Sequence, residues 1–97
     1  PVLLALAGIW NINFLDINNL LLLTYSQRLA YFPHYIQQLD MESNGKSINH
    51  AGERVNYHTG PIVWGGLGNQ AQHSYFQLLC QGTHRVAIDA LTIKEND

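Results

Sequence analysis

Three polar side chains of this sequence, Gln38, Glu42 and His73, are of types that could orient a substrate and move its protons. Gln38 and Glu42 stand four residues apart in a stretch with helical character, so a helix would place both on one face, with His34 one turn earlier. Glu42 would then fall in the last turn, where the helix dipole opposes a carboxylate and favours its uptake of a proton. A general base would need such a raised basicity, so Glu42 is a candidate for that role, with Gln38 on the same face. An ordinary exposed glutamate is the alternative that these residues alone leave open.

His73 follows a second helix-start pattern, because Asn69 and Gln72 fit a capping box with Asn69 as the N-cap. In the first turn of that helix, the dipole would disfavour a cationic imidazole and keep the ring available for proton transfer. The five histidines show neither H-x-x-x-H nor H-E-x-x-H spacing, so we expect no metal site. A structural or surface histidine is the alternative for each of them.

Two further motifs carry less chemistry. Asn44-Gly45-Lys46-Ser47 resembles the end of a phosphate-binding loop, but Asp40 stands where that pattern needs a glycine, and the predicted order is helix then loop. Cys80 is the single cysteine, which excludes a disulfide within the chain and suits a reducing compartment. Cys80 lies two helical turns from His73, too far along the helix for a thiol–imidazole pair.

The elements that must position these residues alternate between helix and strand. Short apolar runs predict three strands, at Leu20–Thr24, Pro61–Trp64 and Val86–Leu91. Helices are expected over 1–14, from Ser26 as a cap to about residue 43 with Pro33 kinking or restarting the helix, and over 69–81; residues 46–60 are expected to form a loop or short hairpin. This order predicts an α/β fold, a doubly wound parallel sheet with flanking helices. Sites in such sheets lie at the carboxyl ends of the strands.

Composition limits the class of protein. The 97 residues fit one domain, and only 12% are charged against roughly 25% in an average soluble protein. Five Lys and Arg residues and a net charge of -2 lack the basic footprint of a nucleic-acid binder. The uncharged stretch 1–15 is shorter than the roughly 20 residues that span a bilayer, and it does not have the form of a secretory signal. We expect a soluble, intracellular piece of a larger protein, with no membrane or nucleic-acid partner.

Four stretches resemble the glucose-6-phosphate isomerase (phosphoglucose isomerase) family, in that family's order and over nearly the whole chain. They are Gln37-Gln38-Leu39-Asp40-Met41-Glu42-Ser43-Asn44-Gly45-Lys46, Thr59–Gly65, the segment from Gln72-His73 to Thr83, and Pro1–Trp10. The resemblance implies that residues 1–97 form part of a single α/β domain, the second sugar-isomerase (SIS) domain of a longer parent enzyme.

The resemblance also implies a task for each site residue. Glu42 would be the base that moves a proton between C2 and C1 of the sugar through a cis-enediol(ate), and Gln38 would touch the sugar phosphate. His73 would assist ring opening, donated across the interface of a homodimer by the partner subunit. The implied reaction interconverts glucose 6-phosphate and fructose 6-phosphate, in glycolysis and gluconeogenesis in the cytoplasm, with no metal or organic cofactor. Because the family's remaining site residues lie on other segments, we expect this piece alone to be inactive.

One stretch departs from the family pattern. Where the family has Gly-Glu-Pro-Gly-Thr-Asn-Gly, this chain reads Gly65-Gly66-Leu67-Gly68-Asn69-Gln70-Ala71, so a glutamate and a proline beside the site are absent. The alternative function is a non-catalytic sugar-phosphate-binding SIS module, such as the sensor domain of a regulator. The rest of the parent chain would distinguish them, because a regulator should carry a DNA-binding segment and an isomerase a second SIS half.

Overall fold

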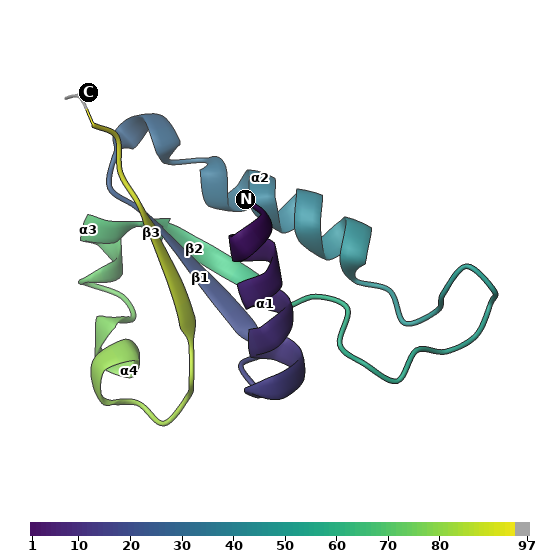
Figure 1. Cartoon of the computed structure of the whole chain (residues 1–97). Helices are drawn as coiled ribbons and strands as arrows, with labels where there is room; N and C mark the ends of the chain where they lie inside the picture. Colours follow the sequence, from purple (N-terminus) through teal and green to yellow (C-terminus); the bar gives the residue numbers. More distant parts are fainter. Residues whose placement is uncertain (95–97) are drawn as a thin grey trace.

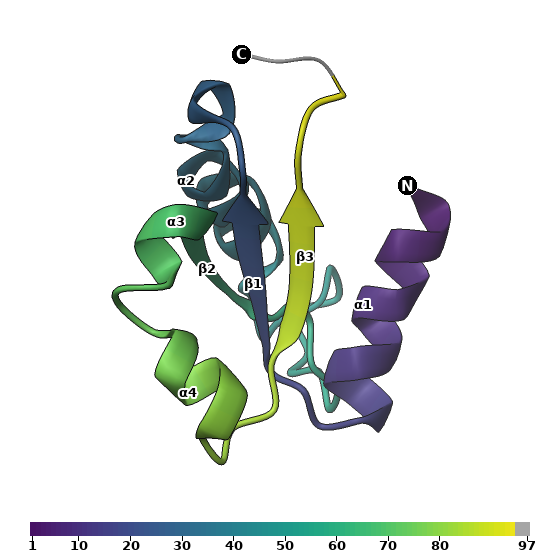
Figure 2. The same cartoon turned by 90° about the vertical axis from the view of Figure 1, so that its left-hand side faces the viewer.

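The run of leucines predicted as the first strand forms the centre of a three-stranded sheet. In the computed structural model, which describes residues 1–94, β1 (Asn19–Thr24) lies between β2 (Ile62–Leu67) and β3 (Ala87–Leu91). Both neighbours are parallel to β1, with Leu20 opposite Val63 on one side and Ala87 on the other. Figure 2 shows β1 and β3 side by side with their arrows in the same direction. The predicted parallel sheet is confirmed.

Helices cover both faces of the sheet, as Figure 1 shows with the sheet almost edge-on. The helical elements are α1 (Val2–Phe14), the 3₁₀ turn η1 (Gln27–Leu29), α2 (Phe32–Ile36), the π-helix η2 (Gln37–Glu42), α3 (Gly68–Ala71) and α4 (Phe76–Gln81). Successive strand residues point to opposite faces. Leu21 and Leu23 pack in the core with Ala71 of α3 and Phe76 of α4. Leu20 and Leu22 line a cavity on the other face with residues of α1 and α2. The chain is therefore a three-layer α/β unit, as predicted.

The segment between β1 and the loop follows the capping chemistry of its residues. The Ser26 hydroxyl accepts a hydrogen bond from the Arg28 N–H at 3.2 Å and begins η1, as expected for a cap. Pro33 stands in the first turn of α2, where its missing N–H costs nothing, so it restarts the helix rather than kinking it. Sequence periodicity did not predict the wider π-helical turn that follows over Gln37–Glu42. A π turn inside a helix is rare and often marks a functional site.

The predicted helix over 69–81 is wrong in its continuity. Residues 72–75 form a turn between α3 and α4, and α3 begins at Gly68, so Asn69 is not its N-cap. The Ser74 hydroxyl donates to the Gln70 carbonyl at 3.0 Å, a local bond that competes with the helical pattern. The Tyr75 ring packs against Trp64, with ring centroids 4.8 Å apart, and this packing draws Tyr75 out of helical geometry.

The loop over residues 46–60 has the predicted character of a loop with a short hairpin. Ile48 and Arg54 form an isolated antiparallel bridge. The Asn13 side chain of α1 fixes the far end of the loop, because it donates to the His58 carbonyl at 3.2 Å and accepts the His58 N–H at 3.0 Å. The loop is thus attached to α1 next to the point where β2 begins.

α1 leaves much of its apolar surface uncovered. Leu3, with 81% of its surface exposed, and Trp10, with 55%, are two of seven large apolar side chains on this helix that face solvent. Such a surface is unusual for a free-standing domain and fits a segment covered by further chain. Within residues 1–94, no helix combines the length and the apolar character needed to cross a bilayer.

Candidate active site

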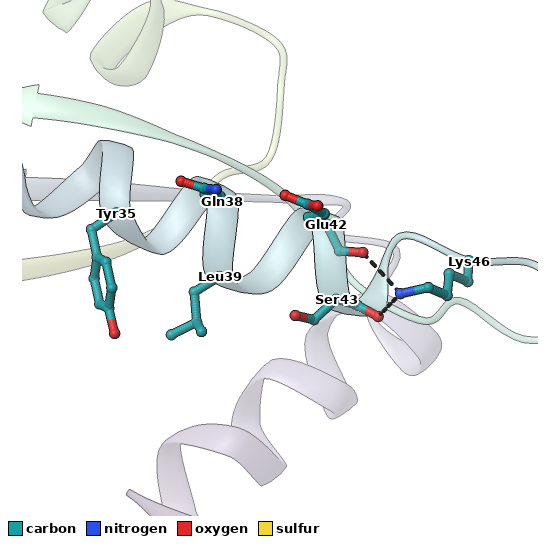
Figure 3. Close-up of a pocket in the computed structure, with 6 residues that line it drawn as sticks. All are labelled: Tyr35, Gln38, Leu39, Glu42, Ser43 and Lys46. Carbon is teal, nitrogen blue, oxygen red and sulfur yellow. Dashed lines mark hydrogen bonds between the residues drawn. The ribbon is translucent and has the colours of Figure 1, made fainter.

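Gln38 and Glu42 lie together in one open cavity. The cavity, of about 510 Å³, is lined by residues of α2, η2 and the segment after them: Tyr35, Gln38, Leu39, Glu42, Ser43 and Lys46. Figure 3 shows Gln38 and Glu42 projecting from the same side of η2, while Tyr35 and Leu39 point to another side. The shared face predicted from their spacing is therefore present, although the turn that carries them is π-helical. His34, predicted to share that face, is exposed and does not line this cavity.

The residues that follow Glu42 end the helix and hold its last carbonyl groups. The Lys46 ammonium group donates to the carbonyl oxygen of Glu42 at 2.9 Å and to that of Ser43 at 2.6 Å (Figure 3). A cation at this position also complements the negative end of the helix dipole. The Asn44 amide donates to the Asp40 carboxylate at 2.7 Å, and the Thr59 hydroxyl donates to the Lys46 carbonyl at 3.0 Å. These bonds fix the backbone at Glu42 and leave its carboxylate facing the cavity.

Gly45 explains why this helix end needs a glycine. A Cβ atom at residue 45 would lie 2.2 Å from the Met41 carbonyl oxygen, which accepts the Gly45 N–H at 2.9 Å. Any larger residue would break that hydrogen bond or move the chain. The string from Asp40 to Lys46 is thus a helix-ending unit in which each polar residue has a physical task. This arrangement argues against the phosphate-loop alternative, because Lys46 donates to helix carbonyls and residues 47–60, which follow it directly, form no helix.

Glu42 lies near the amino end of β2 and not at the carboxyl ends of the strands. Met41, the neighbour of Glu42, contacts Val63 near the amino end of β2, so Glu42 lies beside the start of that strand. The prediction that the site lies at the carboxyl ends of the strands is wrong for Glu42. The physical reason is that α2 and η2 run back from the carboxyl end of β1, and Glu42 stands at the far end of this return.

His73 lies on the other side of the sheet. It is exposed, in the turn between α3 and α4, and its backbone N–H donates to the Gln70 backbone carbonyl at 3.1 Å. The prediction that His73 occupies the first turn of a helix is therefore wrong. α3 and α4 cover one face of the sheet while α2 and η2 lie on the other (Figure 1), so one chain does not bring His73 to Glu42.

The sequence reasoning did not single out Tyr35, Ser43 or Lys46 as residues of this cavity. A usable signal existed only for Lys46, a cation placed directly after a predicted helix end. Burial, and to a smaller extent Tyr25, raises the pKa of the Tyr75 phenol above its ordinary value of 10.0; this tyrosine belongs to the core beside Trp64 rather than to the cavity. Within the described part of the chain, no three His, Cys, Asp or Glu side chains gather as a metal site would require.

The arrangement can accept a proton and return it. An open cavity with a carboxylate and a primary amide on one face can receive a polar molecule, hydrogen-bond its oxygens through the amide and remove a proton through the carboxylate. The cavity is open enough to admit water. Among its described lining residues the one cation is Lys46, whose ammonium group donates to carbonyl oxygens of the helix end. Other segments must therefore supply any further charge.

The comparison with known proteins decides the family. The profile of the family described as phosphoglucose isomerase matches residues 1–97, the whole chain. The chain belongs to the phosphoglucose isomerase family. It is 73% identical, over all 97 residues, to a glucose-6-phosphate isomerase of Legionella pneumophila, and 56% identical over 91 residues to that of Campylobacter jejuni. These stretches are 19% and 17% of the two relatives, so the chain spans about a fifth of their length.

A solved structure from the same family supports this assignment. The crystal structure of a glucose-6-phosphate isomerase from Chlamydia trachomatis superposes with a TM-score of 0.88 at 44% sequence identity. The match covers 93% of this chain and 17% of that one. The α/β fold with three parallel strands and flanking helices is thus a segment of the phosphoglucose isomerase fold.

Proposed function

We propose that the full-length protein interconverts glucose 6-phosphate and fructose 6-phosphate, and that this chain supplies its base. The observation that carries the proposal is the shared cavity of Gln38 and Glu42 in a chain 73% identical to a glucose-6-phosphate isomerase. The segment would then be part of a single SIS-type domain of a longer enzyme. Its work in glycolysis and gluconeogenesis, in the cytoplasm, follows from that reaction.

Glu42 carries the central step. The proton on C2, beside the C1 carbonyl of the open-chain sugar, is weakly acidic, and a carboxylate held over both carbons can remove it. As the C2–H electron pair forms the C1–C2 double bond of a cis-enediol(ate), the C1 carbonyl π pair moves to O1, which takes up a proton. The C2 hydroxyl then loses its proton and becomes the C2 carbonyl, while the C1–C2 π pair takes the proton back from Glu42 at C1. A single carboxylate can perform both transfers because C1 and C2 are neighbours. This chemistry needs no metal and no organic cofactor.

Gln38 and the helix end assist Glu42. Gln38 lines the same cavity one turn earlier, where its amide can hydrogen-bond an oxygen of the substrate. Lys46 holds the Glu42 carbonyl and not its carboxylate, so the base keeps its freedom to accept a proton. The groups that bind the phosphate and stabilise the oxygen of the enediolate must come from other parts of the protein. This piece alone is therefore expected to be inactive.

His73 serves the earlier step of ring opening. The pyranose ring opens when a proton reaches the ring oxygen and another leaves the C1 hydroxyl, work that an imidazole performs near neutral pH. Within one chain the sheet separates the turn that carries His73 from η2. This separation supports a homodimer in which His73 reaches the Glu42 cavity of the partner subunit.

The experiment replaces the base in the full-length protein. Glu42→Gln keeps the size of the side chain and leaves the backbone contacts with Lys46 unchanged. Loss of a general base lowers the rate by about 10²–10⁴, so turnover and solvent-hydrogen exchange at C2 should fall together, while the sugar phosphate still binds. Glu53→Gln is the matched control, because Glu53 is an exposed glutamate on the loop whose described hydrogen bonds are made by its backbone.

The outcomes separate the functions. An unchanged exchange rate in Glu42→Gln would show that another residue moves the proton. A wild-type protein that binds sugar phosphates but neither isomerises them nor exchanges the C2 hydrogen would favour the non-catalytic sensor module. Equal losses in Glu42→Gln and Glu53→Gln would point to a general effect of removing a negative charge.

A further inference from the structure

The outer edge of β2 is covered by side chains instead of another strand. Within the described part of the chain the strand order is β2-β1-β3, so β2 has one strand beside it. The Ile62 N–H donates to the Asn18 carbonyl on the β1 side, so the N–H and carbonyl of the next residue, Val63, point away from β1. Unpaired strand edges normally need water, a helix or another chain to satisfy them.

Two side chains of η2 satisfy this edge. The Gln37 amide donates to the Val63 carbonyl at 2.9 Å, and the Val63 N–H donates to the Met41 sulfur at 3.3 Å. Gln37 and Met41 are both half-buried, and Val63 itself is 1% exposed. One residue of the strand is thus held at its donor and its acceptor by one turn of the helix, in the manner of a neighbouring strand.

The same turn also carries the two cavity residues. Gln37 and Met41 are four residues apart, as are Gln38 and Glu42. Gln37 directly precedes Gln38, and Met41 directly precedes Glu42. Neighbouring positions of a helical turn point in different directions, so one face of η2, with Gln37 and Met41, contacts β2, and the adjacent face, with Gln38 and Glu42, lines the cavity. Any sliding or rotation of η2 on β2 would move the Glu42 carboxylate with it.

We propose that Gln37 and Met41 are positioning residues that fix the Glu42 carboxylate by docking η2 on Val63. The inference rests on the proposed function, since it assigns these residues to the isomerase reaction. Proton transfer from carbon requires the base within hydrogen-bond reach of the proton, and a misplacement of about 1 Å can cost up to 10² in rate. Neither residue lines the cavity, so both act through Glu42 and not on the substrate.

The test uses two variants of the full-length enzyme. Gln37→Leu removes the amide donor at similar size and leaves the Val63 carbonyl without its side-chain partner. Met41→Leu removes the sulfur acceptor with little change of volume. We expect Gln37→Leu to lower kcat and C2 hydrogen exchange by about 10- to 100-fold, with KM within about threefold of wild type. Met41→Leu should show the same pattern with a smaller fall, because a thioether is a weak acceptor.

The control and the outcomes separate positioning from general stability. Gln77→Leu removes the bond between Gln77 and Gln81 at the exposed surface of α4, and it should leave both constants unchanged. A kcat within twofold of wild type in both Gln37→Leu and Met41→Leu overturns the proposal, as does a rise in KM with kcat unchanged. If Gln37→Leu does not fold, Met41→Leu alone decides. A wild-type protein without isomerase activity refutes the proposed function, which is a different result from an active enzyme indifferent to these variants.

Discussion

Gly65 and Gly66 are neighbouring glycines in β2 that should respond in opposite ways to an added methyl group. Gly65 has a φ of +152°, in a region that side-chain-bearing residues rarely adopt. A Cβ atom there would lie 2.0 Å from the carbonyl oxygen of Leu22, its partner on β1, and 2.9 Å from the Leu22 nitrogen. At Gly66, the same atom would meet nothing within 4 Å.

The cost at Gly65 follows from those contacts. The obstructing atoms belong to the backbone of the central strand, so no side-chain rotation relieves them and β2 must move from β1. Overpacking costs about 1–3 kcal/mol, and a side chain at this backbone conformation costs about 1–3 kcal/mol more. Gly65→Ala should therefore lower the free energy of unfolding by roughly 2–6 kcal/mol, a large part of a typical 5–15 kcal/mol. Gly66→Ala should change it by no more than about 0.5 kcal/mol.

Urea denaturation of the full-length protein, followed by far-ultraviolet circular dichroism, measures both variants against wild type. Gly66→Glu, which restores the residue usual in the family, extends the control and should fold like Gly66→Ala. Equal denaturation midpoints for Gly65→Ala and Gly66→Ala would refute the close approach of β2 to Leu22. The same result would also leave unexplained why position 65 matches the family's glycine while position 66 has a glycine in place of the family's glutamate.

Two further predictions concern His73 and Tyr75. In the full-length protein, His73→Ala should slow the isomerisation of a cyclic hexose phosphate far more than that of a four-carbon aldose phosphate, which has no ring to open; equal losses in the two assays would contradict ring opening. The raised pKa of Tyr75 stabilises the fold fully below about pH 10, and this contribution is lost as the pH rises through the raised value. Tyr75→Phe should therefore weaken the alkaline loss of stability, measured as urea midpoints between about pH 8 and pH 11; identical pH dependence in both proteins would argue against it.

The sequence was sufficient for the strands and for the pairing of Gln38 with Glu42. Apolar runs of strand length and a four-residue spacing are local signals, and both survive in the folded chain. β2 extends beyond the predicted end at Trp64 and reaches Leu67, although glycines are weak strand formers. Gly65 and Gly66 both belong to the strand, and at Gly65 the missing side chain permits a close approach to Leu22.

The incorrect predictions concern features that depend on contacts between residues distant in the sequence, which local patterns do not reveal. The helix predicted over 69–81 is interrupted because Tyr75 packs against Trp64, a contact between distant residues. The π turn of η2 coincides with the docking of Gln37 and Met41 on Val63. Predicting it would have required knowing where β2 lies. The predicted position at the carboxyl ends of the strands is wrong for Glu42. The reason is that α2 and η2 run back from the carboxyl end of β1, which brings Glu42 beside the start of β2.

The order β2-β1-β3 also determines what a ribosome must synthesise before this sheet can exist. β1 is made first and lies in the middle, yet Leu20 finds its partners only at Val63 and Ala87. At about 5–20 residues per second, roughly 3–13 s separate the synthesis of Leu20 from that of Ala87. Both edges of β1 lack a partner strand until β2 is made, and one edge still lacks its partner until β3 is made. Synonymous codons that slow translation between β1 and β3 would prolong the time for which these edges are unpaired, and the yield of soluble protein should fall with the delay.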